Sequence, residues 1–152
     1  MKEFLEQYKL NAVLVHTPAN MRNISGFTGE GLVYVSKEDA WILTDSRYTI
    51  AASEESRGFE VLEYKRNIQQ YLVEKIVKEH PELAEKTFRI GFEDAIMTVE
   101  TYRTLEALFE KMNLKQWELV PLHKKLDKMR QIKTPEEIES IKKAEKIGDE
   151  AF

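Results

Sequence analysis

The sequence predicts an α/β domain built on a mixed six-stranded sheet with helices on its faces. Six short apolar runs have the length and composition of buried strands, and apolar residues at helical spacing separate most of them. Two of these runs, 32–35 and 40–43, are separated only by four polar residues, which suits a hairpin. A hairpin joins antiparallel strands, whereas strands joined through helices are usually parallel, so the sheet should be mixed.

The first elements follow from apolar spacing and turn residues. Apolar residues at helical spacing predict a helix over 2–8, which leads into a buried strand over 12–16. The next segment, 17–31, is polar and contains Pro18 and three glycines, so we expect a long loop.

A second helix should follow the hairpin. Thr44 or Asp45 can cap a helix over 46–55, and Gly58 can end the turn after it. The alternating run 59–64 then predicts a strand with one exposed face.

The rest of the predicted domain alternates helices and strands. We expect a helix over 68–77 that ends before Pro81, a strand over 89–92, a helix over 102–112 and a last strand over 117–120. With the earlier elements, this completes six strands.

The end of the chain predicts a linker and a further helix. Segment 122–133 is rich in Lys and Arg and has no strong period, so it should link domain 1–121 to the last helix. Thr134, with proline at the first helical position and a carboxylate three residues after the cap, should begin that helix over 134–152.

The last helix has an apolar stripe but no terminator. No glycine cap, basic last turn or proline occurs before Phe152, and the stripe has no evident partner. We therefore expect the chain to be the front part of a longer protein, with 134–152 as the start of the first helix of an absent domain.

Composition excludes several classes of function. The net charge of -4 is mild and dispersed, so we expect no nucleic-acid partner. The chain contains no cysteine, which excludes disulfides, thiol nucleophiles and thiolate metal sites. The N-terminus has no apolar run long enough for a signal peptide or membrane span, so we expect a cytoplasmic protein and no membrane partner.

The chemistry-bearing residues predict neither a catalytic nor a metal site within this chain. None of the three histidines is spaced as a helical metal pair. Adjacent carboxylates such as Glu93-Asp94 do not face each other on regular elements, so solvation or helix N-terminus charge is their simplest role.

Two polar segments remain candidates for binding. The glycines of segment 26–31 do not match a dinucleotide fingerprint, and the simplest interpretation is a chain reversal in which Phe27 either folds onto the core or is held out toward a partner. Segment 44–48 passes from a strand to a helix, where ligands often meet α/β sheets. The simpler interpretation, which we prefer from the local sequence, is that Asp45 caps the helix while Arg47 and Tyr48 pack on neighbouring residues.

Three motifs in register resemble the N-terminal domain of the creatinase/prolidase family. They are Asn23-Ile24-Ser25-Gly26-Phe27-Thr28-Gly29, the run from Trp41 to Tyr48, and Met129-Arg130-Gln131-Ile132-Lys133-Thr134-Pro135-Glu136-Glu137-Ile138, with Ile90-Gly91-Phe92-Glu93 between the last two. Xaa-Pro dipeptidases and Xaa-Pro aminopeptidases are the commonest members of that family.

The resemblance implies a ribonuclease H-like first domain, joined by a linker to a pita-bread catalytic domain. In that second domain two divalent metals, usually manganese, cobalt or zinc, are held by two Asp, one His and two Glu, and activate water. None of those ligand motifs occurs here, so we expect this chain to hold no cofactor and to hydrolyse nothing by itself.

The expected role is therefore to limit the substrate of a metal-dependent proline peptidase and to form its dimer. The resemblance implies that its loop, 20–31 here, reaches toward the active site of a second subunit in a homodimer. The partners would be the chain's own catalytic domain, that second subunit and proline-containing peptides. The implied contact residues are Arg22, Phe27, Thr28, Glu30, Arg47 and Tyr48.

Two other functions remain open on the sequence alone. Family-like folds also serve as non-catalytic protein- or peptide-binding modules, so the chain could have that role. An unrelated small-molecule-binding domain would require a pocket between 26–31 and 45–48.

Overall fold

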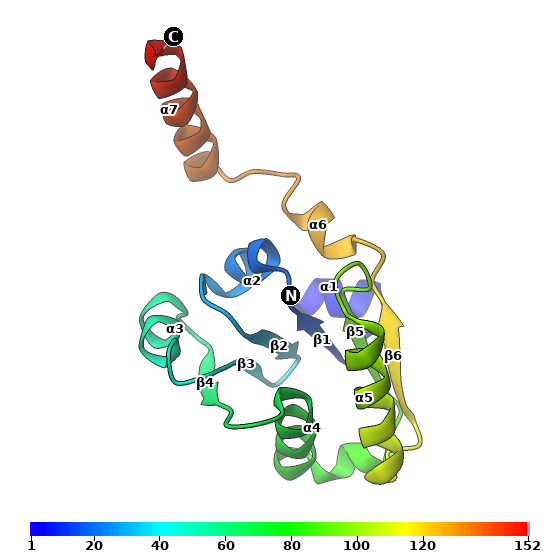
Figure 1. Cartoon of the computed structure of the whole chain (residues 1–152). Helices are drawn as coiled ribbons and strands as arrows, with labels where there is room; N and C mark the ends of the chain where they lie inside the picture. Colours follow the sequence, from blue (N-terminus) through cyan, green and yellow to red (C-terminus); the bar gives the residue numbers. More distant parts are fainter. Residues whose placement is uncertain (152) are drawn as a thin grey trace.

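A computed structural model describes residues 1–151, and it confirms the mixed six-stranded sheet with helices on its faces (Figure 1). The strand order is β4-β3-β2-β1-β5-β6. The strands are β1 (Ala12–Val15), β2 (Leu32–Ser36), β3 (Ala40–Thr44), β4 (Glu60–Glu63), β5 (Phe88–Phe92) and β6 (Trp117–Pro121).

The directions of the strands place most loops of interest at one end of the sheet. β2 pairs antiparallel with β1 and β3, as the hairpin predicted, and every other pairing is parallel. Five strands therefore end where β2 begins. We call this end the carboxyl edge, and the segments after β1, β3, β5 and β6 all start there.

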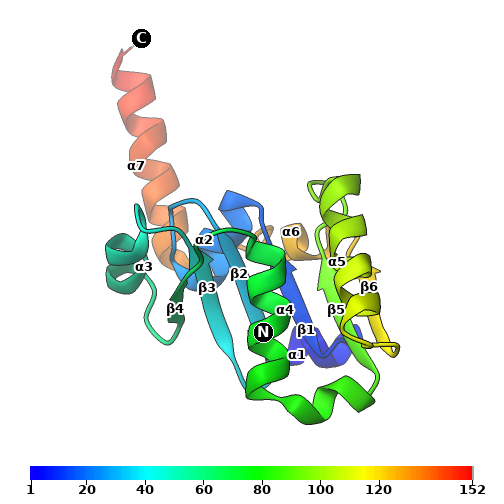
Figure 2. The ribbon, with the colours of Figure 1, turned by 60° about the horizontal axis from the view of Figure 1, so that its bottom comes forward.

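Helices cover both faces of the sheet (Figure 2). On one face lie α4 and α5; α1, α2, α3 and α6 pack with the other. The helices are α1 (Lys2–Gln7), α2 (Pro18–Ser25), α3 (Thr49–Glu55), α4 (Ile68–Glu79), α5 (Val99–Lys111), α6 (Lys125–Met129) and α7 (Pro135–Ala151), with a 3-10 turn η1 at Pro81–Glu85.

Alternation along the strands divides the core into two layers. In β1, Ala12 and Leu14 face α4 and α5, whereas Val13 and Val15 face the other helices. Successive strand residues point to opposite faces, so one run of four apolar residues serves both layers. Each fully buried aliphatic side chain contributes about 1.5–3 kcal/mol to the free energy of folding. The two core layers therefore hold the strands, and with them the carboxyl edge, in place.

The expectation of a long loop over 17–31 is wrong in its first half, because residues 18–25 form α2. Pro18 occupies the first turn and Gly26 adopts the left-handed conformation that ends the helix. The helix buries Asn20, Met21 and Ser25, so two of its three buried residues are polar. The apolar residues of this segment therefore form too weak a helical pattern to predict α2 from the sequence.

Helix α3 begins three residues later than expected. We expected Thr44 or Asp45 to cap a helix from residue 46, but the N-cap position is Tyr48. The Asp45 carboxylate instead accepts hydrogen bonds from Arg47, and Thr44 donates to the Glu30 carbonyl, so neither side chain caps the helix.

The segment predicted to be a linker contains a short helix, α6. Leu122 and Leu126 are only 1% and 2% exposed, so these two residues pack into the core. Segment 122–133 is therefore partly integrated into the domain, which its charge-rich composition hid.

The last helix begins as predicted. Thr134 accepts a hydrogen bond from the Glu137 N–H, and the Glu137 carboxylate accepts one from the Thr134 N–H, which makes a capping box. Helix α7 stands away from the sheet and buries no residue, although Ile138, Ile141 and Ile147 lie along it (Figure 1). Within residues 1–151, none of the helices combines the length and the apolar character that a membrane span requires.

Candidate functional site

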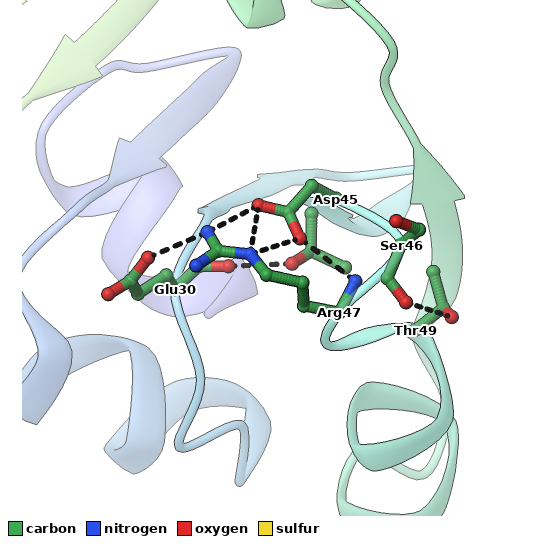
Figure 3. Close-up of polar contacts among 6 residues, drawn as sticks. Glu30, Asp45, Ser46, Arg47 and Thr49 are labelled. Atoms are coloured by element: carbon green, nitrogen blue, oxygen red, sulfur yellow. Dashed lines mark hydrogen bonds and ion pairs between the residues drawn. The ribbon is translucent and has the colours of Figure 1, made fainter.

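The two candidate segments meet at the carboxyl edge, where loop 26–31 lies against the start of the β3–α3 connection (Figure 3). We call the residues that join them the loop cluster. The loop cluster consists of Phe27, Thr28, Glu30, Asp45, Arg47, Tyr48 and Glu55.

Close backbone packing determines the path of the loop. A Cβ atom on Gly31 would lie 2.3 Å from the carbonyl oxygen of Leu43, so only glycine lets β2 begin so close to β3. A Cβ atom on Gly29 would lie 2.6 Å from the Phe27 ring and 2.7 Å from the Tyr48 ring. The glycines are therefore needed for packing in this loop.

The structure decides between the two positions considered for Phe27. Its side chain is 0% exposed and belongs to the core, and its ring meets the ring of Tyr48 edge to face at 6.4 Å between centroids. Phe27 is folded back, so it supports the loop from beneath. The expectation that it is itself held out to a partner or substrate is corrected, because the core encloses its side chain.

Arg47 links both segments through two carboxylates. Its guanidinium donates to both oxygens of Asp45, at 3.0 Å from Nε to Oδ1 and 2.7 Å from Nη2 to Oδ2, and to Glu30 Oε2 at 3.1 Å (Figure 3). These hydrogen bonds hold the pKa of Asp45 below its ordinary value and raise the pKa of Arg47. The guanidinium carbon also lies 5.1 Å from the centre of the Tyr48 ring.

Further hydrogen bonds attach the loop at two more points. The Thr28 N–H and hydroxyl donate to the Glu55 carboxylate at 2.7 and 2.9 Å, and the Thr44 hydroxyl donates to the Glu30 carbonyl at 2.6 Å. Thr28 and Glu30 are nevertheless exposed. The loop thus presents polar side chains to solvent from a backbone that is held by hydrogen bonds.

Arg22 lies apart from the other predicted residues. It is exposed in the last turn of α2, and among the described residues it makes no side-chain hydrogen bond or ion pair. Its backbone carbonyl accepts the hydrogen bond from the Gly26 N–H at 2.8 Å. The structure therefore brings together five of the six predicted residues.

A second polar group at the carboxyl edge was not predicted. Asn20, Glu93, Asp127 and Arg130 form one connected set of hydrogen bonds, which we call the clasp. Asn20 and Glu93 are 1% and 8% exposed, so the solvent role expected for Glu93 is wrong. The sequence predicts the clasp only weakly. The one signal is that polar residues follow strands that end at the same edge of the sheet.

Both nearby histidines interact with carboxylates, His16 through its backbone N–H and His123 through its backbone N–H and its ring. His123 donates its backbone N–H to Asp94 at 2.7 Å, and its ring lies 3.0 Å from the same carboxylate. Burial opposes ionisation of Asp94, but the hydrogen bonds outweigh it, so the pKa of Asp94 lies below its ordinary value. Burial lowers the pKa of His16, and the Glu93 carboxylate opposes that shift.

The described residues do not provide a metal site. Among residues 1–151, no three His, Asp or Glu side chains are grouped so that they could hold a metal ion.

Comparisons with known proteins give the family. The model of the creatinase/prolidase N-terminal domain matches residues 1–132. An uncharacterised peptidase, YqhT, of Bacillus subtilis (strain 168) is 32% identical over 156 residues, which cover 100% of this chain and 40% of that protein.

Solved structures agree in fold. An Xaa-Pro dipeptidase from Bacillus anthracis superposes with a TM-score of 0.76 at 26% identity, covering 91% of this chain and 36% of that one. The N-terminal domain of the cytoplasmic peptidase PepQ from Mycobacterium tuberculosis H37Rv gives a TM-score of 0.68 at 28% identity, covering 84% and 92% of the two chains. This chain therefore spans about two fifths of the full-length relatives.

Proposed function

Because the chain belongs to the creatinase/prolidase N-terminal domain family, we propose that it is the dimer-forming and substrate-limiting domain of a metal-dependent Xaa-Pro dipeptidase or aminopeptidase. The main support is the loop cluster. In it, loop 26–31 is held by hydrogen bonds and exposes polar side chains at the carboxyl edge. The domain's own role is non-catalytic.

The catalytic domain and this N-terminal domain would have different roles. When bound in the catalytic domain, two divalent metals would supply an activated water. The residues of this chain would instead form one side of the substrate-binding site. Thr28 and Glu30 are exposed on a loop that is hydrogen-bonded to α3 and β3, and Arg47 is exposed on the adjoining β3–α3 connection. Together they can restrict the length of a bound peptide and exclude water.

The partners proposed are a catalytic domain, a second copy of the protein and proline-containing peptides. The exposed apolar side chains of α7 support the first, because Ile138, Ile141 and Ile147 lie at 44%, 53% and 69% exposure. We propose a cytoplasmic location, which fits a chain without cysteine.

Kinetics of the full-length protein test the proposal. Arg47→Met releases Glu30 and Asp45 from their shared cation, so we expect the ratio of kcat/KM for Xaa-Pro tripeptides to that for Xaa-Pro dipeptides to change. Lys37→Met is the matched control, because it removes an exposed ion pair with Glu6 away from the carboxyl edge. An unchanged ratio in Arg47→Met would contradict the substrate-limiting role.

The isolated chain provides the second test. Residues 1–152 should hydrolyse no Xaa-Pro dipeptide and should retain no stoichiometric transition metal after dialysis. Hydrolysis that persists after repurification, with contaminating peptidase excluded, would overturn the proposal. Analytical ultracentrifugation of the full-length protein tests the dimer, and a monomer at micromolar concentration would contradict that part.

A further inference from the structure

Asn20 uses its side-chain amide to hold three other residues of the clasp. Its Nδ2 donates to Glu93 Oε1 at 2.6 Å and to Asp127 Oδ1 at 2.9 Å, and its Oδ1 accepts from Arg130 Nε at 2.6 Å. Both donors of the amide are therefore in use. The partners lie 73, 107 and 110 residues away along the chain.

Glu93 attaches this group to the sheet. Its second oxygen accepts the backbone N–H groups of His16 and Thr17 at 2.6 and 2.8 Å. These residues connect β1 to α2, while Glu93 directly follows β5. The carboxylate thus joins two parallel strands, and Asn20 is hydrogen-bonded to a rigid part of the molecule.

The other side of the clasp lies on the segment through which the chain leaves the domain. Leu126 is buried, but Asp127 and Arg130 line a cavity of about 260 Å³ together with Asn20 and Glu93. On this side the exit segment 127–130 is held by hydrogen bonds, because apolar packing ends at Leu126.

Helix α2 connects the clasp to the loop cluster. Asn20 lies near its start and Gly26 caps its end, where loop 26–31 begins. The eight-residue helix is about 12 Å long, and its hydrogen-bonded backbone links Asn20 to Gly26 within two turns.

We infer that Asn20 is a positioning residue that couples the exit segment 127–130 to loop 26–31. The inference rests on the proposed function, because it couples the substrate-limiting loop to the segment that leads toward α7. Through this coupling, the direction in which the chain leaves the domain and the position of the loop are set together.

Hydrogen exchange of the chain tests the coupling. In Asn20→Ala we expect the amides of both 26–31 and 125–131 to exchange about ten-fold faster or more, while those of β1 and β2 stay protected. Asn11→Ala is the matched control. Its side-chain oxygen also accepts a long-range hydrogen bond, from the Arg89 N–H at 2.7 Å, but at the other end of the sheet. It should leave both segments unchanged.

A polarity-reversed variant separates positioning from general destabilisation. Asn20→Asp alone places a third carboxylate beside Glu93 and Asp127, so exchange should rise further. Adding Glu93→Gln and Asp127→Asn restores donors for the new carboxylate and keeps an acceptor for Arg130. Exchange in both segments should then return toward that of the unmodified chain.

Two results would overturn the coupling. One is faster exchange in 125–131 with an unchanged loop. The other is a triple variant that melts like the unmodified chain yet exchanges like Asn20→Ala. Activity of the full-length protein distinguishes the two proposals: if Asn20→Ala loosens both segments but leaves the tripeptide-to-dipeptide ratio unchanged, the substrate-limiting role fails and the coupling stands.

Discussion

The carboxylate of Glu55 accepts hydrogen bonds from both the backbone N–H and the hydroxyl of Thr28, 27 residues earlier in the chain. Glu55 is the last residue of α3, and Thr28 lies in the loop that precedes β2. The backbone of Gly26 approaches the carbonyl oxygen of the same glutamate. One helix end therefore holds the loop at two points, through a side chain and through close backbone packing.

Substitution of Gly26 tests the backbone contact. Gly26 has a φ of 84°, and an added Cβ atom would lie 2.6 Å from the Glu55 carbonyl oxygen. We expect Gly26→Ala to lower the free energy of unfolding by about 1–2 kcal/mol for the backbone conformation, and by about 1–3 kcal/mol more for the clash. Urea denaturation measures the sum.

Gly58 provides the matched control for that variant. Its φ is 83°, but nothing lies within 4 Å of an added Cβ atom. Gly58→Ala should therefore have only the conformational cost. Equal losses in the two variants would show that the approach to Glu55 does not constrain the loop.

The pKa of Asp45 should depend on Arg47. Hydrogen bonds from Arg47 hold this pKa below its ordinary value of 3.8, so Arg47→Met should raise it in an NMR titration of the carboxyl carbon. Because the pKa is lowered in the folded state, the stabilisation is present above the unfolded value and is lost as the pH falls through the folded one. The contribution is small because the pair is exposed.

Asp94 is the internal reference for this titration. Its pKa is also below its ordinary value, but its hydrogen bonds come from His123 and not from Arg47. It should titrate identically in both proteins. A parallel rise at Asp94 would mean that Arg47→Met disturbs the whole carboxyl edge.

Removal of the Glu93 side chain should destabilise the domain strongly. Glu93→Ala leaves two backbone N–H groups and the Asn20 amide without their acceptor, so we expect a loss on the order of 3 kcal/mol in chemical denaturation. Glu63 is exposed at the same edge, and Glu63→Ala should cost less than about 0.5 kcal/mol. Similar losses would contradict the structural role of Glu93.

Truncation locates the end of the stable domain. Helix α7 buries no residue, so a chain of residues 1–133 should unfold within about 0.5 kcal/mol of the unmodified chain. A chain of residues 1–121 lacks buried Leu122 and Leu126 and should lose about 3 kcal/mol or more. If the domain ended at residue 121, both truncated chains would be equally stable. Thermal unfolding of the two chains distinguishes these positions of the domain boundary.

Elements with strong local signals could be predicted from the sequence. The β2–β3 hairpin needs only two apolar runs and a four-residue polar connection, and the start of α7 needs only the Thr134 and Glu137 pair. Helix α2 escaped prediction because its buried side chains include Asn20 and Ser25, whose burial depends on hydrogen bonds to residues far along the chain or to the backbone.

Local patterns in the chain were enough to predict the six strands and the mixed sheet, because alternation, capping and turn chemistry act over a few neighbouring residues. Long-range packing alone established that Phe27 faces the core, that Glu30 pairs with Arg47, and that Glu93 is buried. A carboxylate has the same local preferences in solvent or in a hydrogen-bonded cluster. Its role depends on which distant donors the strand order brings within about 3 Å.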